Sequence, residues 1–305
     1  MPDIVKLKAK QIDGARPGPH LLITGGVHGD EFEPMAAIRR LMGWIEPAQL
    51  SGRVTLVPVV NEAAYLCGQR TADDGLDIAR VCPGRADGSI TERTAFALSQ
   101  WIRAADYYID LHTGGTALEV LPLTGYTLHS DRTVLEAQRR MARAFNLPVI
   151  WGTPGLPGRS LSVAAGARVP AIYAEYRGGG RCDPAGIEAY VDGCMNVMGE
   201  LKMIEREPPQ SKIQHIVEDN RPNAGFMQIQ NPSPMTGFFE PSVKLGDAIN
   251  IDDALGTVSD APGTNVATVR ARQAGIVLVL RTFSRVLEGE SVGVILETER
   301  DCRDA

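Results

Sequence analysis

Three short polar segments of this chain carry the residue types that bind metal ions and move protons. Residues 25–31 contain His28 and Glu31, Asp110-Leu111-His112 adds a second imidazole, and Ala174-Glu175 adds a second carboxylate. Two imidazoles and one carboxylate, with one coordination position left for water, are the ligand set of a catalytic zinc site. The pattern therefore predicts hydrolytic metal chemistry.

The spacing within these segments indicates how such a site is built. His28 and Glu31 are three residues apart in a glycine-containing loop, so one turn can direct both side chains to a single point. A third ligand then comes from a neighbouring strand end, and His112 is the best candidate. Asp110 lies on the same face of that strand and can hold the imidazole from behind.

A less specific interpretation has to be weighed for each residue. An isolated His-x-x-Glu arises often by chance, and a single histidine is usually structural or solvated. Here two of only five histidines follow apolar runs and lie beside carboxylates, which favours the metal site. His20, His129 and His215 lack this context. Glu175 is either a solvated carboxylate at a strand end or a general base that moves protons beside a metal.

The elements that must position these residues alternate between strands and helices. We expect strands at residues 21–24, 54–60, 107–111, 149–151 and 171–174, and helices at residues 34–45, 91–104, 131–145 and 186–201. This alternation predicts an α/β fold with a mainly parallel sheet. Functional residues gather at the carboxyl ends of the strands in such sheets. His28, His112 and Glu175 all stand at such ends.

The last third of the chain has a different pattern. Residues 205–212 are charged and contain a Pro-Pro pair, which favours a linker. Residues 212–305 contain short β-type runs separated by turn signals, which predicts a small all-β domain after a first domain at residues 1–205. Two similar turn segments, at residues 245–247 and 287–290, hint at an internal pseudo-symmetry.

Composition excludes several other classes of protein. The chain has 305 residues and a formal net charge of -6, with no block of Lys or Arg, so no affinity for nucleic acid is expected. Five cysteines without a CxxC pair fit a reducing compartment, and we expect a cytoplasmic protein. Residues 1–10 have no signal-peptide core, and no stretch approaches the ~18 apolar residues of a membrane helix.

Taken together, these segments make the chain resemble the succinylglutamate desuccinylase/aspartoacylase family, which is related to the zinc carboxypeptidases. The matching residues are 26–31, 110–114 and Glu175, with Asn61-Glu62-Ala63, Arg70 and residues 74–84 between them in the same order. The resemblance implies a zinc-carboxypeptidase-like α/β/α sandwich with a mainly parallel or mixed central sheet, followed by a small, barrel-sandwich-like β domain.

The resemblance also implies a role for each matching residue. His28, Glu31 and His112 would bind one Zn²⁺ ion per chain, and Glu175 would be the general base and acid. Arg70 would stabilise the oxyanion. Asn61 and Arg80 would contribute to substrate binding, with Arg80 pairing with a substrate carboxylate. The implied activity is a zinc-dependent deacylase that cleaves the amide bond of a small N-acyl amino acid or a related compound.

One departure from the family pattern concerns substrate recognition. The family has Asn before the arginine at this place, whereas this chain has Ala79-Arg80. We therefore expect a substrate whose carboxylate is placed differently or is absent, unless another arginine near Glu175 supplies the missing contact. The candidates are Arg159, Arg168, Arg177 and Arg181.

Two other functions remain open from the sequence. One is a zinc carboxypeptidase acting on peptides. The other is a non-enzymatic carrier or binding module of biotinyl or lipoyl type, although the nearest match to a carrier lysine, Leu201-Lys202-Met203, lies upstream of the β domain. A homo-oligomer is compatible with all of these readings.

Overall fold

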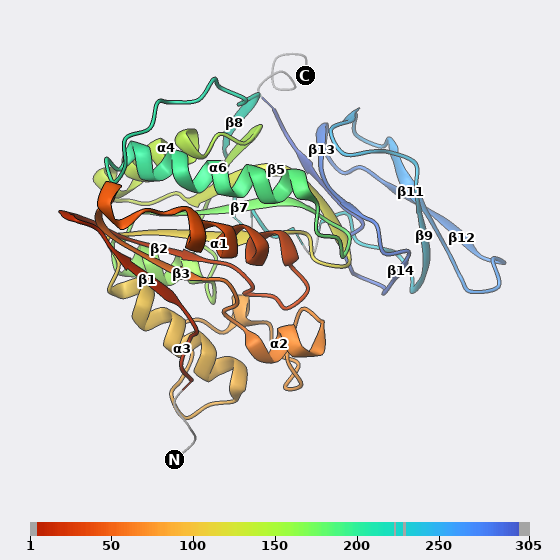
Figure 1. Ribbon diagram of the computed structural model, residues 1–305. Helices are drawn as coiled ribbons and strands as arrows, with labels where there is room; N and C mark the ends of the chain where they lie inside the picture. The colour runs from red at the N-terminus through yellow and green to blue at the C-terminus, as the bar shows by residue number, and fades with distance from the viewer. Residues whose placement is uncertain (1–4, 223, 228–229, 299–305) are drawn as a thin grey trace.

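The protein is a mixed α/β structure in which one large sheet lies between two layers of helices. The computed structural model describes residues 5–222, 224–227 and 230–298. Within these residues eleven strands form the large sheet, and four more form a second, smaller sheet. Figure 1 shows the smaller sheet at one end of the large one, away from the helices.

The elements have the following bounds. The large sheet contains β1 (Lys10–Asp13), β2 (Arg16–Thr24), β3 (Ser51–Val57), β4 (Tyr107–His112), β5 (Leu118–Thr127), β6 (Val149–Thr153), β7 (Ala171–Gly178), β8 (His215–Glu218), β10 (Ala248–Ile249), β13 (Gly275–Arg281) and β15 (Gly293–Leu296). The smaller sheet contains β9 (Gly237–Pro241), β11 (Ala254–Ser259), β12 (Val266–Arg270) and β14 (Arg285–Val286). The helices are α1 (Phe32–Trp44), α2 (Glu62–Cys67), α3 (Ile90–Arg103), α4 (Arg132–Phe145), α5 (Ser160–Gly166) and α6 (Pro184–Glu200), with short 3-10 turns at Pro47–Gln49 and Ile78–Arg80.

The order and direction of the strands bring the polar segments together. Strands β3, β2, β4 and β7 are parallel neighbours, and β5 runs antiparallel to β7. The carboxyl ends of β2, β4 and β7 therefore meet at one edge of the sheet. There His112 and Glu175 are register partners on adjacent strands. The loop with His28 and Glu31 follows β2 at the same edge.

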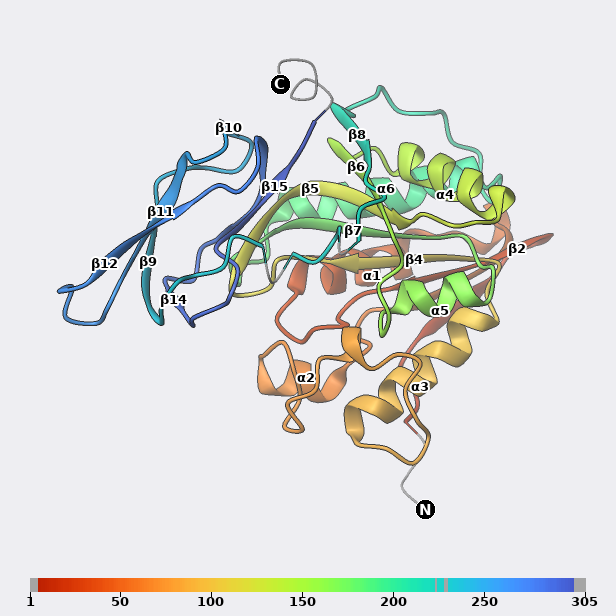
Figure 2. The ribbon, with the colours of Figure 1, turned by 180° about the vertical axis from the view of Figure 1, so that it is seen from behind.

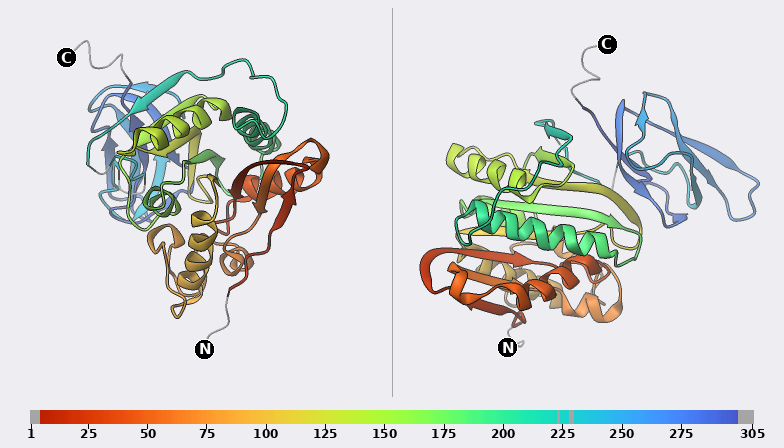
Figure 3. Two further views of the ribbon diagram at one scale, coloured as in Figure 1. Left: turned by 90° about the vertical axis from the view of Figure 1, so that its left-hand side faces the viewer. Right: turned by 45° about the horizontal axis from the view of Figure 1, so that its top comes forward.

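Two apolar cores hold the helices against the sheet. On one face α1, α4 and α6 cover the side chains of Leu21, Ile23, Ile109 and other strand residues. On the other face α3 and α5 cover Leu22 and Tyr108 among others. Figure 2 and the views in Figure 3 show the resulting layers, helix over sheet over helix. The sequences of the inner strands are continuous apolar runs because both faces of the sheet are buried.

The sequence-based expectations fit most of this arrangement. Each predicted strand and helix of the first part is present, and the sheet is of the mixed type. Strand β5, helix α5 and the short β1 and α2 were not predicted. No helix in the described part of the chain is both long and apolar enough to cross a membrane.

The last third of the chain is more closely joined to the first part than the pattern indicated. Strand β8 pairs in parallel with β6 of the large sheet, through His215↔Val149 and the residues that follow. Strand β13 pairs with β5, with Val279 opposite Val120, so the large sheet continues into this region. The separate four-stranded sheet agrees with a β-rich end of the chain. The division into domains at residues 1–205 and 212–305 stays a prediction.

Candidate metal centre and the cavity around it

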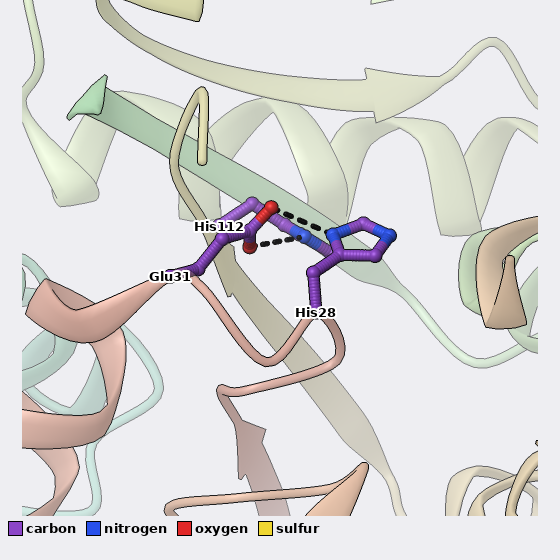
Figure 4. A group of neighbouring side chains, drawn as sticks. All are labelled: His28, Glu31 and His112. Carbon is purple, nitrogen blue, oxygen red and sulfur yellow. Dashed lines mark hydrogen bonds and ion pairs between the residues drawn. The ribbon is translucent and has the colours of Figure 1, made fainter. Parts of the chain in front are cut away.

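The loop after β2 brings two of the candidate ligands together. His28 and Glu31 are 3% and 1% exposed, and Glu31 occupies the N-cap position of α1. Gly29 between them allows a close approach to α2, because a Cβ there would lie 2.1 Å from the backbone carbon of Ala64. His112, at the end of β4, faces this loop. Figure 4 shows the Glu31 carboxylate linked by one oxygen to each of the two imidazoles.

The donor atoms of these three residues converge on one point. The Nδ1 atom of His28 lies 2.6 Å from Glu31 Oε1, and the Nδ1 atom of His112 lies 3.1 Å from Glu31 Oε2. One ligand atom from each residue falls within 4.8 Å of the other two. Ligands that share a zinc ion at ~2.0–2.2 Å lie at separations of this order, so a set of two nitrogens and one oxygen fits the metal.

The remote nitrogen of each imidazole supports the same assignment. His28 Nε2 lies 3.1 Å from Asp77 Oδ1, and His112 Nε2 lies 3.1 Å from Asp110 Oδ2. When Nε2–H donates to a carboxylate, the Nδ1 lone pair is left for a metal, and this is how metal-binding histidines are usually held. The position of Asp110 matches its expected place behind His112.

Without a metal, the site is held together by mutual charge. Burial alone would raise the pKa of Glu31, but the charges of His28 and His112 outweigh it and keep that pKa well below its usual range. Burial would likewise lower the pKa of His112, yet the carboxylates of Asp110 and Glu31 raise it well above its ordinary value. A divalent cation would replace the protons that balance these carboxylates.

Asp77 joins the metal site to Arg70. Its Oδ2 atom accepts hydrogen bonds from Arg70 Nε at 3.2 Å and Nη2 at 2.9 Å, while Oδ1 faces His28 and accepts from the Ala79 amide at 2.9 Å. The remaining Arg70 nitrogen, Nη1, lies 3.8 Å from Glu31 Oε1. Arg70 therefore stands beside the metal site with its orientation fixed.

Glu175 has the environment of a proton carrier. It is 7% exposed, and its Oε2 atom is buried without a hydrogen-bond partner in the described part of the chain. Burial raises the pKa of Glu175 to about 8, and the positive charge of His112 offsets only part of this effect. A carboxyl group with a pKa near neutrality can both take and give a proton at working pH.

One cavity contains most of the predicted site residues. His28, Glu31, His112, Glu175, Arg70 and Arg80 all line it, together with Ala79. Asn61 does not. It is fully buried, and its Oδ1 atom accepts from Ala64 N at 3.2 Å, as the N-cap of α2. The cavity volume of about 80 Å³ is several times the roughly 10–15 Å³ that one water needs on this measure.

Of the four candidate arginines near Glu175, the structure brings one into the cavity. Arg159 lines it, and its buried Nε atom has no partner among the described residues. Burial lowers the pKa of Arg159, and the positive charge of Arg80 adds to this effect. An anion bound beside Arg159 would therefore stabilise its charge. The other three pair elsewhere, Arg168 with Asp131, and Arg177 and Arg181 with Glu119.

Sequence reasoning did not single out two residues that touch the metal site. Asp77 lies within the matching stretch between Arg70 and Arg80. The repeated acidic and basic residues of this stretch are the sequence signal that could have identified Asp77. Ser160 donates a hydrogen bond to Asp110 Oδ2, while Thr24 donates to Oδ1 at 2.8 Å. No local signal connects Ser160 with Asp110, because only the fold brings the first residue of α5 to β4.

Comparison with known proteins gives one consistent family. Residues 17–201 match the model of the succinylglutamate desuccinylase/aspartoacylase catalytic domain. The chain is 31% identical over 289 residues to the N-alpha-acetyl-L-2,4-diaminobutyric acid deacetylase of Halomonas elongata, covering 92% of this chain and 82% of that protein. It is also 31% identical over 138 residues to the succinylglutamate desuccinylase of Burkholderia thailandensis, or 39% of each chain.

Solved structures agree over almost the whole chain. A succinylglutamate desuccinylase/aspartoacylase from Rhodobacter sphaeroides superposes with a TM-score of 0.86 at 26% identity, covering 96% of this chain and 90% of the other. The product-bound ectoine utilization protein EutE (DoeB) from Ruegeria pomeroyi gives the same TM-score and identity, with coverages of 95% and 89%. Because they cover 95–96% of this chain, these superpositions extend into the C-terminal β region.

Proposed function

Because the chain belongs to the succinylglutamate desuccinylase/aspartoacylase family, we propose that it is a zinc-dependent deacylase that hydrolyses the amide bond of a small N-acyl amino acid. One observation carries the proposal. The Nδ1 atoms of His28 and His112 converge with Glu31, and the buried carboxylate of Glu175 stands beside His112 on the next strand. This combination provides a metal site and a proton carrier in one cavity.

In this mechanism His28, Glu31 and His112 hold one Zn²⁺ ion per chain. When bound, zinc supplies a Lewis acid that polarises the amide carbonyl and lowers the pKa of water. Glu175 takes a proton from the attacking water and gives it to the amide nitrogen as the C–N bond breaks. The products are a carboxylic acid, which gains the water oxygen, and a free amine.

Arginines provide the charge complement for the substrate. Arg70, held by Asp77, directs Nη1 toward the metal site and donates to the carbonyl oxygen as negative charge develops there. Arg80 and Arg159 line the cavity from two touching segments, since Cys82 N donates to Gly158 O at 2.9 Å. We assign them to the carboxylate of the amino acid, a group that planar guanidinium donors recognise well. Asn61 caps α2 and does not line the cavity, so the proposal gives it no direct contact with the substrate.

Further features of the proposal follow the family resemblance. We propose that the layered fold is of the zinc-carboxypeptidase type and that the enzyme is cytoplasmic. The cysteines agree with a reducing compartment, because Cys67, Cys82, Cys182 and Cys194 are all free thiols. No observation favours a carrier function, since Lys202 follows α6 and lies outside the β region. Assembly into a homo-oligomer stays a prediction.

A substrate panel tests the proposed function against the carboxypeptidase alternative. Zinc-loaded protein is assayed for amine release from N-acetyl-aspartate, N-acetyl-glutamate, N-α-acetyl-2,4-diaminobutyrate, N-succinylglutamate and a set of dipeptides. We expect cleavage of at least one N-acyl amino acid, loss of activity with a chelator, and recovery on adding zinc. Cleavage of dipeptides alone would favour a peptidase, and no cleavage of either group would refute a hydrolase.

A further inference from the structure

Tyr173 is a cavity residue to which neither the family resemblance nor the proposed mechanism gives a role. It precedes Glu175 by two residues on β7, so the two side chains lie on the same face of the sheet. Tyr173, Glu175 and Arg159 line the same cavity. The ring packs over Gly125 of β5, where a Cβ would lie 2.2 Å from ring Cε1 and 2.5 Å from the hydroxyl oxygen. Glycine at that position therefore leaves the space that the ring occupies.

The hydroxyl of Tyr173 differs from those of the other tyrosines packed around the sheet. Tyr126 donates to Glu218 at 2.6 Å, Tyr108 pairs with Thr24 at 2.8 Å, and Tyr190 donates to a backbone carbonyl. Tyr173 has no hydrogen-bond partner in the described ranges of the chain, and its oxygen stays accessible from the cavity. Tyrosine hydroxyls in packed surroundings normally find a partner, so this donor is left for a ligand.

The guanidinium of Arg159 is a second hydrogen-bond donor that lines the same cavity as Tyr173. Arg159 and Tyr173 line this cavity together with Glu175. The buried Nε atom of Arg159 also lacks a partner among the described residues, while Nη2 faces the Gly225 carbonyl at 3.4 Å. A cationic donor and a neutral donor thus line one cavity, each with a hydrogen atom that no described residue accepts. A carboxylate, which only accepts, is the complementary group.

Residue 79, which lines the same cavity, explains why a second donor is required. At residue 79 the side chain is a methyl group, so it offers the substrate no hydrogen bond. A carboxylate taken from water needs its lone pairs satisfied, because a buried acceptor left without a partner is strongly unfavourable. Tyr173 can provide from β7 the neutral hydrogen bond that Ala79 cannot provide.

We propose that Tyr173 is a specificity-determining residue whose hydroxyl donates a hydrogen bond to the carboxylate of the N-acyl amino acid, beside Arg159. The inference rests on the proposed deacylase function, whose substrate carries that carboxylate. Tyr173 then contributes to binding in the ground state and in the transition state alike, so its loss raises KM and leaves kcat nearly unchanged.

Steady-state kinetics of zinc-loaded Tyr173→Phe test this role. The substitution removes one hydroxyl and keeps the ring packed on Gly125. With the best-cleaved N-acyl amino acid of the panel, we expect KM to rise about tenfold to a hundredfold, the range for one hydrogen bond to a charged group. The inhibition constant of the free amino acid product should rise by a similar factor, because the product keeps the carboxylate.

Tyr176→Phe is the matched control. Tyr176 lies on the same strand with its ring against Tyr190, 6.1 Å between centroids, and does not line the cavity. We expect wild-type KM and kcat for this variant. An unchanged KM in Tyr173→Phe, or a fall in kcat at constant KM, would overturn the inference while the wild-type activity upholds the proposed function. A wild-type enzyme that cleaves no N-acyl amino acid would instead refute the function on which the inference rests.

Discussion

The substitution Asp77→Asn is the most informative perturbation of the site, because Asp77 contacts both His28, a proposed metal ligand, and Arg70, the proposed donor to the substrate carbonyl. Its carboxylate faces His28 Nε2 at 3.1 Å and accepts two hydrogen bonds from Arg70, at 3.2 and 2.9 Å. It also accepts from the Ala79 amide at 2.9 Å. An asparagine keeps one oxygen. If that oxygen stays on Ala79, an NH₂ group meets the Arg70 donors and their two bonds are lost.

The magnitude follows from these contacts. Hydrogen bonds to charged groups contribute about 1.5–3 kcal/mol each, and Arg70 is partly exposed, so we expect the free energy of unfolding to fall by about 2–3 kcal/mol. His28 loses its charged acceptor, and loss of such a partner typically weakens metal binding by about 10–100-fold. We therefore expect Asp77→Asn to lower both the free energy of unfolding and the zinc affinity.

Two assays and one control separate these effects. Zinc affinity is measured by competition with a chromophoric chelator, and stability by urea unfolding of the metal-free protein. Asp74→Asn is the control, since Asp74 accepts from Thr91 N at 3.0 Å and Thr91 Oγ1 at 2.8 Å and contacts no proposed ligand. It should lower stability and leave zinc affinity unchanged. Wild-type zinc affinity in Asp77→Asn, or equal weakening in both variants, would refute the reasoning.

Three further results are expected. Arg159→Met should raise KM for an N-acyl amino acid at least about tenfold in steady-state assays. Arg168→Met, at a residue outside the cavity, should leave KM unchanged. Equal KM values in the two variants would contradict the assignment of Arg159 to the substrate carboxylate. Ser160→Ala removes a hydrogen bond to Asp110 and should weaken zinc binding about tenfold, as measured by chelator competition. An unchanged zinc affinity would show that Ser160 of α5 does not support the proposed metal site. In the metal-free protein, Glu175 has a pKa raised from 4.5 to about 8, so between these values the folded state holds a proton that the unfolded state has lost. Stability should therefore fall with rising pH by about 1.4 kcal/mol per unit relative to Glu175→Gln in paired urea titrations, and parallel curves would count against the raised pKa.

The parts of the fold that sequence reasoning found are those with an uninterrupted local pattern. The helices α1, α3, α4 and α6 have apolar residues at helical spacing, and the inner strands are short apolar runs. Strand β5 was missed because Pro122 and Gly125 interrupt its apolar pattern. Its register against β7 shifts between Val120 and Leu123, around Pro122, which a strand can accommodate at such an irregularity.

Long-range pairing explains the remaining differences in the fold. Residues 215–218 look like any short β-type run, and nothing local indicates that they join β6 of the large sheet. The same holds for β13, which continues the large sheet from β5. A boundary drawn from composition near residue 205 does not reveal these connections, because sheet partners are fixed by tertiary packing.

The candidate site divides in the same way. His28, Glu31, His112 and Glu175 could be selected because each follows an apolar strand, and parallel strands place such residues at one edge. The substrate side depends on side chains from distant elements. Arg159 could not be distinguished from its three neighbours by sequence, and Tyr173 looked like one more residue of a buried strand. Only the cavity sets these two apart from the structural residues around them.

The central claim is that Glu175 moves the proton beside a zinc ion held by the His-Glu-His set. The most direct test is the kcat of zinc-loaded Glu175→Gln on an N-acyl amino acid that the wild-type enzyme cleaves, with zinc content determined on the same sample. We expect one zinc ion per chain and a kcat lowered by about 10²–10⁴-fold, the usual contribution of general acid–base catalysis. Wild-type turnover by the zinc-loaded variant would contradict the account.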